Sequence, residues 1–241
     1  QMISPESLNR CVQSRADMGE SVALRLARSE EGLALLRQDD YRLANQISED
    51  AFLRPAANSA REGHTVAFWL SASQEGKHIL IRNNFSFANM ITPQLLNCTI
   101  DCNSPDRPQR KRDEHDGESI AFWLAYPHGH YSGGIHSSSS NSSSSCGTGR
   151  QQRDQRNEQE QEEELGVRIL LYDQGGGRGS LAEHLVEDTL NHLVTSHDSS
   201  QQGLSVAYLL ATSGAGLQLL SSNGHRLLSM VASRYATESP C

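Results

Sequence analysis

The sequence predicts an all-α protein, a right-handed α-solenoid of four helical repeats. Three observations support this prediction. A pattern that opens with glycine recurs at Gly19, Gly63 and Gly203 and extends 28 residues further each time without a gap. The segment before each occurrence recurs as well, and the apolar residues within the pattern follow helical rather than alternating spacing. A fourth occurrence starts at Gly117 and is interrupted.

The repetition divides the chain into four copies that begin at equivalent residues. Their starts read ISPESL, ISEDAF, ITPQLL and LVEDTL. Copies one and two span 44 residues each and copy four about 46, whereas copy three spans 94 because its pattern stops after Pro127 and resumes at Gly166. The copies cover residues 3–46, 47–90, 91–184 and 185–230, within one helical-repeat domain of residues 1–241.

Each copy is expected to form three or four short helices, at about residues 4–15, 20–28, 30–38 and 40–46 in copy one. The first helix opens with a hydroxyl N-cap followed by proline in Ser4-Pro5 and Thr92-Pro93. Glycine breaks the chain before the second helix, and Asp39 and its equivalents punctuate the end of the third. Three equivalent serines are expected to cap the third helix: Ser29, Ser73 and Ser213.

Helices this short are not stable alone, so each copy must bury its apolar face on the next. A small alanine recurs where two helices would approach closely, and a leucine follows three residues later on the same face. These positions are Ala23, Ala67, Ala121 and Ala207, followed by Leu26, Leu70, Leu124 and Leu210. An apolar pair supplies the core of the third helix: Leu35-Leu36, Ile79-Leu80, Ile169-Leu170 and Leu219-Leu220.

In period and pattern this arrangement resembles armadillo- and HEAT-type helical repeats, and also the helical repeat arrays of bacterial effector proteins. The tryptophan-glycine-tyrosine pattern of tetratricopeptide repeats and the TPLH of ankyrin repeats are both absent. The resemblance implies an α-solenoid scaffold and carries no activity with it.

Residues 128–165 form a long insertion in copy three, with a Ser/Gly tract followed by a Gln/Glu-rich run. Because this low-complexity segment lacks apolar residues, it is expected to be disordered. A shorter insertion covers residues 104–116. Both insertions are open to two interpretations, a neutral expansion of a surface loop or a functional loop.

The composition narrows the classes of function. A net charge of −8 argues against a nucleic-acid binder, and no window reaches the ~18 apolar residues of a membrane helix. Five sparse, unevenly spaced cysteines favour reduced thiols, and no leader is visible after Gln1. These features predict a soluble, cytoplasmic protein, with secretion into a host cell as an effector as the alternative.

Candidate chemistry in the sequence has a structural interpretation in each case. The GGGRGS of residues 175–180 lacks the lysine and preceding strand of a phosphate-binding loop and is expected to be a flexible turn. His115, His128, His130, His136 and Cys146 lack the fixed spacing of a zinc site and are expected to be solvated. Cys98 and Cys102 are expected to be buried small hydrophobes. The sequence thus predicts no catalytic residue, metal or cofactor.

Aromatic residues follow the small alanines and suggest a binding surface. Adjacent residues of a short helix cannot both face one core, so the sequence predicts protein-partner contacts at Phe68, Trp69, Phe122, Trp123 and Tyr208. The alternative is that both tryptophans lie between stacked repeats.

The predicted function is a non-catalytic scaffold that binds a protein or peptide. One alternative is the repeat region of a larger protein, such as a secreted effector, with its catalytic domain elsewhere. A third possibility is an enzyme that holds a metal in the His-rich loop. The sequence predicts no oligomeric state.

Overall fold

The computed structural model describes residues 3–13, 19–57, 63–100, 115, 117–126, 164–174, 179–195, 201–222 and 226–237. These residues form helices joined by loops, with no β-strand among them, so the predicted all-α class is confirmed for the described chain. None of the helices in these ranges is long and apolar enough to cross a membrane. Most of the expected insertion lies outside them, and so do His128, His130, His136 and Cys146, which were expected to be solvated, and Cys102, which was expected to be buried.

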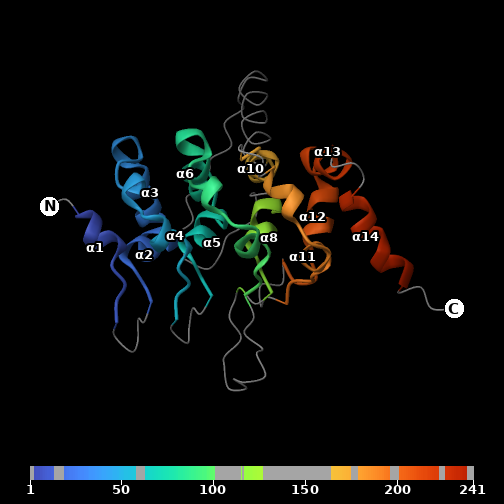
Figure 1. Ribbon diagram of the computed structural model, residues 1–241, viewed down its shortest axis with the longest axis horizontal. Helices are drawn as coiled ribbons and strands as arrows, with labels where there is room; N and C mark the ends of the chain where they lie inside the picture. The colour runs from blue at the N-terminus through green and yellow to red at the C-terminus, as the bar shows by residue number, and fades with distance from the viewer. Residues whose placement is uncertain are drawn as a thin grey trace, which may run out of the picture.

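The helices follow one another in a recurring order (Figure 1). Copy one contains α1 (Pro5–Asn9), α2 (Val22–Arg28), α3 (Glu30–Tyr41) and the 3₁₀ turn η1 (Ala44–Gln46). Copy two contains α4 (Glu49–Leu53), α5 (Val66–Ser71), α6 (Gln74–Phe85) and η2 (Ala88–Met90). Copy three contains α7 (Pro93–Asn97), α8 (Ile120–Ala125), α10 (Leu165–Leu171) and η3 (Leu181–His184), and copy four contains α11 (Glu187–Asn191), α12 (Val206–Thr212), α13 (Gly214–Ser222) and the start of α14 (Arg226–Thr237).

Hydroxyl caps start these helices as the sequence predicts. The Ser4 and Thr92 side chains accept hydrogen bonds from Ser7 N and Leu95 N at the starts of α1 and α7. The three serines predicted to cap the third helices do so, each by accepting from a glycine amide three residues later. Each cap satisfies an amide that the helix leaves without an internal partner.

The first helix is shorter than expected, because α1 ends at Asn9 rather than near residue 15. The chain after it forms a loop whose two sides are hydrogen bonded: Val12 N donates to Glu20 O, and Gly19 N donates to Val12 O. The same two bonds recur at Ala56 with His64 and Gly63, at Ile100 with Glu118 and Gly117, and at Val194 with Leu204 and Gly203. The glycine has a positive φ, between 79° and 91°, in all four loops.

The second and third helices of each copy approach so closely that the third helix requires glycine. A Cβ at Gly32 would lie 2.2 Å from Leu26 O, and the same contact is 2.2, 2.0 and 2.2 Å at Gly76, Gly166 and Gly216. No side chain fits there, so the carbonyl group of the second helix lies in direct contact with the backbone of the glycine in the third helix. The close approach was expected at the alanines, which are also buried, and these glycines were not predicted to make it.

The third helix ends at three consecutive residues with positive φ in copies one and two. These residues are Asp39, Asp40 and Tyr41 in copy one and Asn83, Asn84 and Phe85 in copy two. Asp and Asn tolerate this conformation better than most side chains. The predicted punctuation at Asp39 and Asn83 is therefore confirmed at these two positions.

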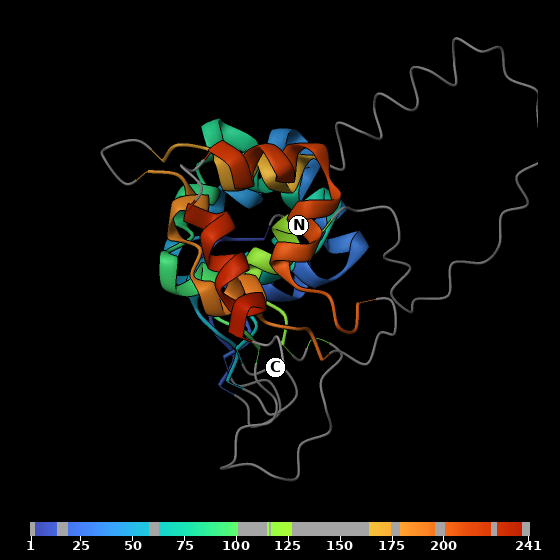
Figure 2. The ribbon, with the colours of Figure 1, turned by 90° about the vertical axis from the view of Figure 1, so that its right-hand side faces the viewer.

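Helices at equivalent positions lie side by side along the molecule (Figure 1). The second helices α2, α5, α8 and α12 contact one another in succession, and so do the third helices α3, α6, α10 and α13. Figure 2, which views the molecule along this direction, shows the equivalent helices overlapping. The core lies between these rows and includes Ala67, Leu70, Leu124 and Leu210.

Polar side chains also join neighbouring copies. Asn9 at the end of α1 donates to Gln46 O (2.7 Å) and accepts from Ser48 N (2.9 Å). The equivalent Asn97 and Asn191 donate to His184 O and Met230 O. Met230 belongs to α14, which runs on to Thr237, beyond the expected end of copy four at residue 230. Arg82 of copy two lies over the ring of Tyr41 of copy one. Tyr172 of copy three, at the position equivalent to Arg82, stacks on Phe85 of copy two with the ring centroids 3.8 Å apart.

Candidate functional site

The structure brings four of the five predicted binding residues together and buries most of them. Phe68 and Trp69 lie on α5 and Phe122 and Trp123 on the neighbouring α8. Phe68, Phe122 and Trp123 are at most 2% exposed and Trp69 is half-buried. Because they are buried, Phe68, Phe122 and Trp123 present no anchoring surface to a partner. Tyr208 lies apart from them on α12 and is 57% exposed.

Glu118 is the polar centre of this buried region. Its Oε2 accepts a hydrogen bond from Trp123 Nε1 (2.9 Å) and lies 2.7 Å from His115 Nδ1. Glu118 and His115 are almost fully buried, so the expectation of a solvated His115 is wrong. A buried carboxylate is costly unless hydrogen bonded, and these two partners offset that cost.

Aromatic rings surround His115 and connect copies two and three. The ring of His115 is perpendicular to that of Trp69 at 4.9 Å and lies 5.5 Å from His64 and 5.6 Å from Phe68. Phe68 stacks on His64, which is also buried. We call this set the aromatic junction: His64, Phe68, Trp69, His115, Glu118 and Trp123.

The aromatic junction explains why only the two central copies carry tryptophan. The residue after the loop glycine pairs with the residue five positions later. This pair is a hydrogen bond between Glu118 and Trp123 in copy three and an edge-to-face ring contact between His64 and Trp69 in copy two. The recurrence of tryptophan at this position was evident from the sequence, whereas its contacts with His64 and Glu118 were not.

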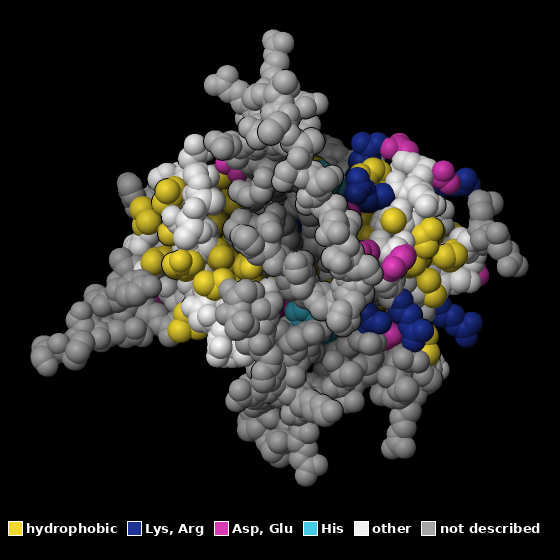
Figure 3. All heavy atoms as spheres, turned by 180° about the vertical axis from the view of Figure 1, so that it is seen from behind, with side chains coloured by type: hydrophobic (Ala, Val, Ile, Leu, Met, Phe, Trp, Pro, Cys, Tyr) yellow, Lys and Arg dark blue, Asp and Glu magenta, His cyan; other side chains and the backbone are white. Residues whose placement is uncertain are grey.

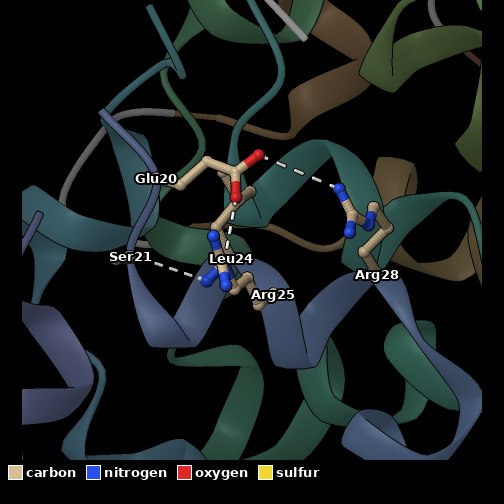
Figure 4. Close-up of polar contacts among 5 residues, drawn as sticks. All are labelled: Glu20, Ser21, Leu24, Arg25 and Arg28. Atoms are coloured by element: carbon tan, nitrogen blue, oxygen red, sulfur yellow. Dashed lines mark hydrogen bonds and ion pairs between the residues drawn. The ribbon is translucent and has the colours of Figure 1, made fainter. Parts of the chain in front are cut away.

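In copy one the same positions hold an ion pair instead. Arg25 Nε lies 3.0 Å from Glu20 Oε2, and Arg28 approaches the other oxygen of Glu20 at 3.9 Å (Figure 4). Glu20 is buried, whereas the Arg25 side chain is 50% exposed. Copy four places Leu204 and Leu209 at these positions. The tryptophans thus belong to a variable pair inside the fold, not to a shared surface motif.

Lys77 on α6 is a second buried polar group at the same junction. The equivalent positions in copies one and three hold the apolar Leu33 and Val167. Lys77 Nζ donates to Tyr126 O at 3.1 Å, and a Cβ at Gly166 would lie 2.9 Å from it. Desolvation by burial lowers the pKa of Lys77 well below its ordinary value. Lys77 therefore reaches into copy three from copy two.

The described residues hold no cluster of three or more His, Cys, Asp and Glu side chains suited to a metal ion. Cys98 is exposed, which corrects the expectation that it is buried. At the end of the GGGRGS stretch, Gly179 has a positive φ and Ser180 forms a capping box with Glu183, whereas residues 175–178 lie outside the description.

An exposed apolar surface lies at the C-terminal end of the array. We call Tyr208, Ala211 and Leu217 of copy four the trailing face. Tyr208 and Leu217 are 57% and 53% exposed and Ala211 is exposed. Their equivalents in the first three copies are all buried: Leu24, Phe68 and Phe122; Ala27, Ser71 and Ala125; Leu33, Lys77 and Val167.

The loop glycines repeat this contrast. A Cβ at Gly19, Gly63 or Gly117 would meet the following copy within 3.3 Å, whereas one at Gly203 meets no described atom within 4 Å. Seen from behind, hydrophobic side chains gather toward the C-terminal side of the molecule, at the left, and Lys and Arg toward the N-terminal side (Figure 3). The trailing face is thus a surface that the fold covers in three copies and leaves open in the fourth.

Comparisons of the chain with protein-family models, with curated proteins and with solved structures found no match.

Proposed function

We propose that this chain is a non-catalytic helical-repeat scaffold, a right-handed α-solenoid of four repeats that binds a protein partner. The recurring helix order, the side-by-side rows of equivalent helices and the repeated loop hydrogen bonds support the repeat architecture. A rigid array of this kind offers its partner surfaces whose shape is set before binding, which lowers the entropic cost of association.

The observation that supports binding most directly is the exposure of the trailing face. Tyr208 and Leu217 stand at positions that are buried against a neighbouring helix in every other copy. Exposed tyrosine and leucine side chains on rigid helices are suited to a protein interface, and tyrosine is enriched among residues that dominate binding energy. The binding surface therefore lies on copy four, rather than on copies two and three as the sequence suggested.

The burial of the polar groups supports a role without catalysis. Glu118, His115 and Lys77, which carry the ionisable chemistry of the aromatic junction and its surroundings, are each at most 2% exposed. A substrate in solution would have no access to them in this conformation. The hydrogen bond of Lys77 to Tyr126 O joins copy two to copy three, and that of Glu118 to Trp123 Nε1 holds the chain before α8 against α8.

An affinity pull-down with trailing-face variants tests this function. We expect the wild-type chain to capture a protein that the double variant Tyr208→Asp, Leu217→Asp does not retain, because a buried charge disrupts an apolar contact. Gln218→Asp is the matched control, since Gln218 is exposed, as are its equivalents Ala34 and Arg168, and its third equivalent His78 is half-buried. Capture that is equal for the wild type and the double variant would contradict the proposal, as would no capture by the wild type.

A further inference from the structure

The inner copies show what covers the positions equivalent to the trailing face. In copy two, Phe68 contacts His115 of copy three, and Lys77 donates to Tyr126 O of copy three. The helices that carry Phe68 and Lys77, α5 and α6, contact α8 and α10 of copy three. In copy two these positions are therefore covered by the second and third helices of copy three together with His115 and Tyr126, which flank α8.

The opposite end of the molecule exposes the other half of this contact. We call Val22, Leu26 and Leu35 of copy one the leading face. Val22 and Leu26 are half-buried and Leu35 is 42% exposed. The equivalents in the later copies are at most 2% exposed: Val66, Ile120 and Val206; Leu70, Leu124 and Leu210; Ile79, Ile169 and Leu219. The second helices α5, α8 and α12 of the later copies each pack on the second helix of the copy before, whereas no described copy packs on α2 from that side.

The two faces belong to opposite ends of one elongated array (Figure 1). Copy one, with α2 and α3, lies at one end, and copy four, with α12 and α13, at the other. The leading and trailing faces of one chain cannot meet each other, although each resembles one side of the contacts inside the array. A partner that carries a leading face could cover the exposed side chains of the trailing face.

We infer that the trailing face of one chain binds the leading face of a second copy of the same chain. This inference rests on the proposed function and names its partner. In the complex α2 and α3 of one chain pack on α12 and α13 of the other, as α5 and α6 pack against their neighbours within the chain. The helix α14 packs on α11 and α13 beside this surface and leaves Tyr208 and Leu217 exposed.

The contact is head-to-tail, so it does not close on itself as a symmetric dimer does. Each added chain presents a fresh trailing face, and the chains form open assemblies whose length grows with concentration. Because each chain carries a net charge of −8, the chains repel one another, and salt screens that repulsion. Added salt is expected to lengthen the assemblies, which is the opposite of its effect on a contact made by ion pairs.

Sedimentation velocity of separate and mixed variants tests the inference. Leu35→Asp blocks the leading face, and the double variant Tyr208→Asp, Leu217→Asp blocks the trailing face. The wild type and Gln218→Asp should sediment as species that grow with concentration, whereas each blocked variant alone should remain a monomer. An equimolar mixture of the two blocked variants should form a dimer and nothing larger, since it contains one intact pair of faces.

Three results would overturn the inference: a wild type that stays monomeric across the concentration range, blocked variants that assemble like the wild type, or a mixture that stays monomeric. Circular dichroism melts confirm that each variant folds, and Leu35→Gln or Tyr208→Gln replaces any variant that does not. A monomeric wild type that still captures another protein through Tyr208 and Leu217 would overturn the second-copy partner alone. Loss of that capture as well would overturn the proposed function.

Discussion

Phe68 of the aromatic junction and Tyr208 of the trailing face occupy equivalent positions of the chain in opposite surroundings. Phe68 and its equivalent Phe122 are buried on α5 and α8, which contact the second helices of the copies that follow them. At the junction, Glu118 binds both His115 and Trp123. At the C-terminal end, Tyr208 holds the position of Phe68 and Phe122 and is 57% exposed. The side chains are similar in kind, and the difference is that a described copy packs beyond Phe68 and Phe122 and none packs beyond Tyr208.

This contrast shows that a residue's role in a repetitive fold depends on its neighbour as well as on its own helix. A phenylalanine in the middle of the array contributes to the stability of the chain. A tyrosine at the equivalent position of the last copy contributes little to that stability and is available to a partner. The following predictions test the two regions against each other, from the largest expected effect to the smallest.

Truncation at the aromatic junction should have the largest effect. Trp123→Ala removes a fully buried ring and leaves the Glu118 carboxylate without its indole donor. We expect a loss of about 3–5 kcal/mol in the free energy of unfolding, measured by urea denaturation. Trp123→Phe separates the two causes, because it keeps most of the apolar contact and loses the donor. A loss below about 1 kcal/mol for Trp123→Ala would contradict the buried position of this ring.

Adding one methyl group where two helices touch should have the next largest effect. Gly76→Ala places a Cβ 2.2 Å from Leu70 O, which forces α5 and α6 apart. We expect a loss of about 1–3 kcal/mol or more in the free energy of unfolding. Gly214→Ala is the matched control, because no described atom lies within 4 Å of its Cβ and alanine favours the helix by up to ~1 kcal/mol. Equal effects of the two variants would show that the close approach does not exist.

Replacing Lys77 should stabilise the protein in a manner that depends on pH. The pKa of Lys77 is lowered by burial, so between that lowered pKa and the unfolded value the unfolded chain binds a proton that the folded chain does not. Stability therefore falls as the pH decreases through this window, by at most about 1.4 kcal/mol per pH unit.

Lys77→Met removes the free-energy cost of keeping Lys77 uncharged in the folded protein, and it matches the apolar residues at this position in copies one and three. We expect the variant to be more stable than the wild type at neutral pH, with the difference shrinking as the pH approaches the unfolded pKa of lysine. Urea denaturation between about pH 6 and 10 measures this, with Arg168→Met at an exposed position of α10 as the control. A difference that is the same at every pH would show that Lys77 is charged in the folded protein.

Local signals in the sequence identified much of this architecture. The caps at Ser4, Ser29 and Thr92 were predictable because a hydroxyl before a helix has one dominant use, to accept from an unpaired amide. The punctuation at Asp39 was predictable because few residues besides glycine tolerate a positive φ.

Features that depend on contacts between copies were not predictable in the same way. The first helix was expected to run to residue 15 because nothing in its sequence announces the loop bonds between Val12 and Glu20. His115 was taken for a solvated residue because Trp69, His64 and Phe68, whose rings surround it, come from copy two, although Glu118 lies only three residues further along the chain. Tyr208 was predicted to contact a partner together with Phe68 and Phe122, but Phe68 and Phe122 are buried and Tyr208 alone of the three is exposed.

The free energies of unfolding of Phe122→Ala and Tyr208→Ala, compared under conditions where the chain is monomeric, test the central claim most directly. The two residues are equivalent in sequence and differ in whether another copy covers them. We predict a loss of about 3–5 kcal/mol for Phe122→Ala and less than about 1 kcal/mol for Tyr208→Ala. Similar losses for the two variants would contradict the account, because they would mean that Tyr208 is as deeply packed as Phe122.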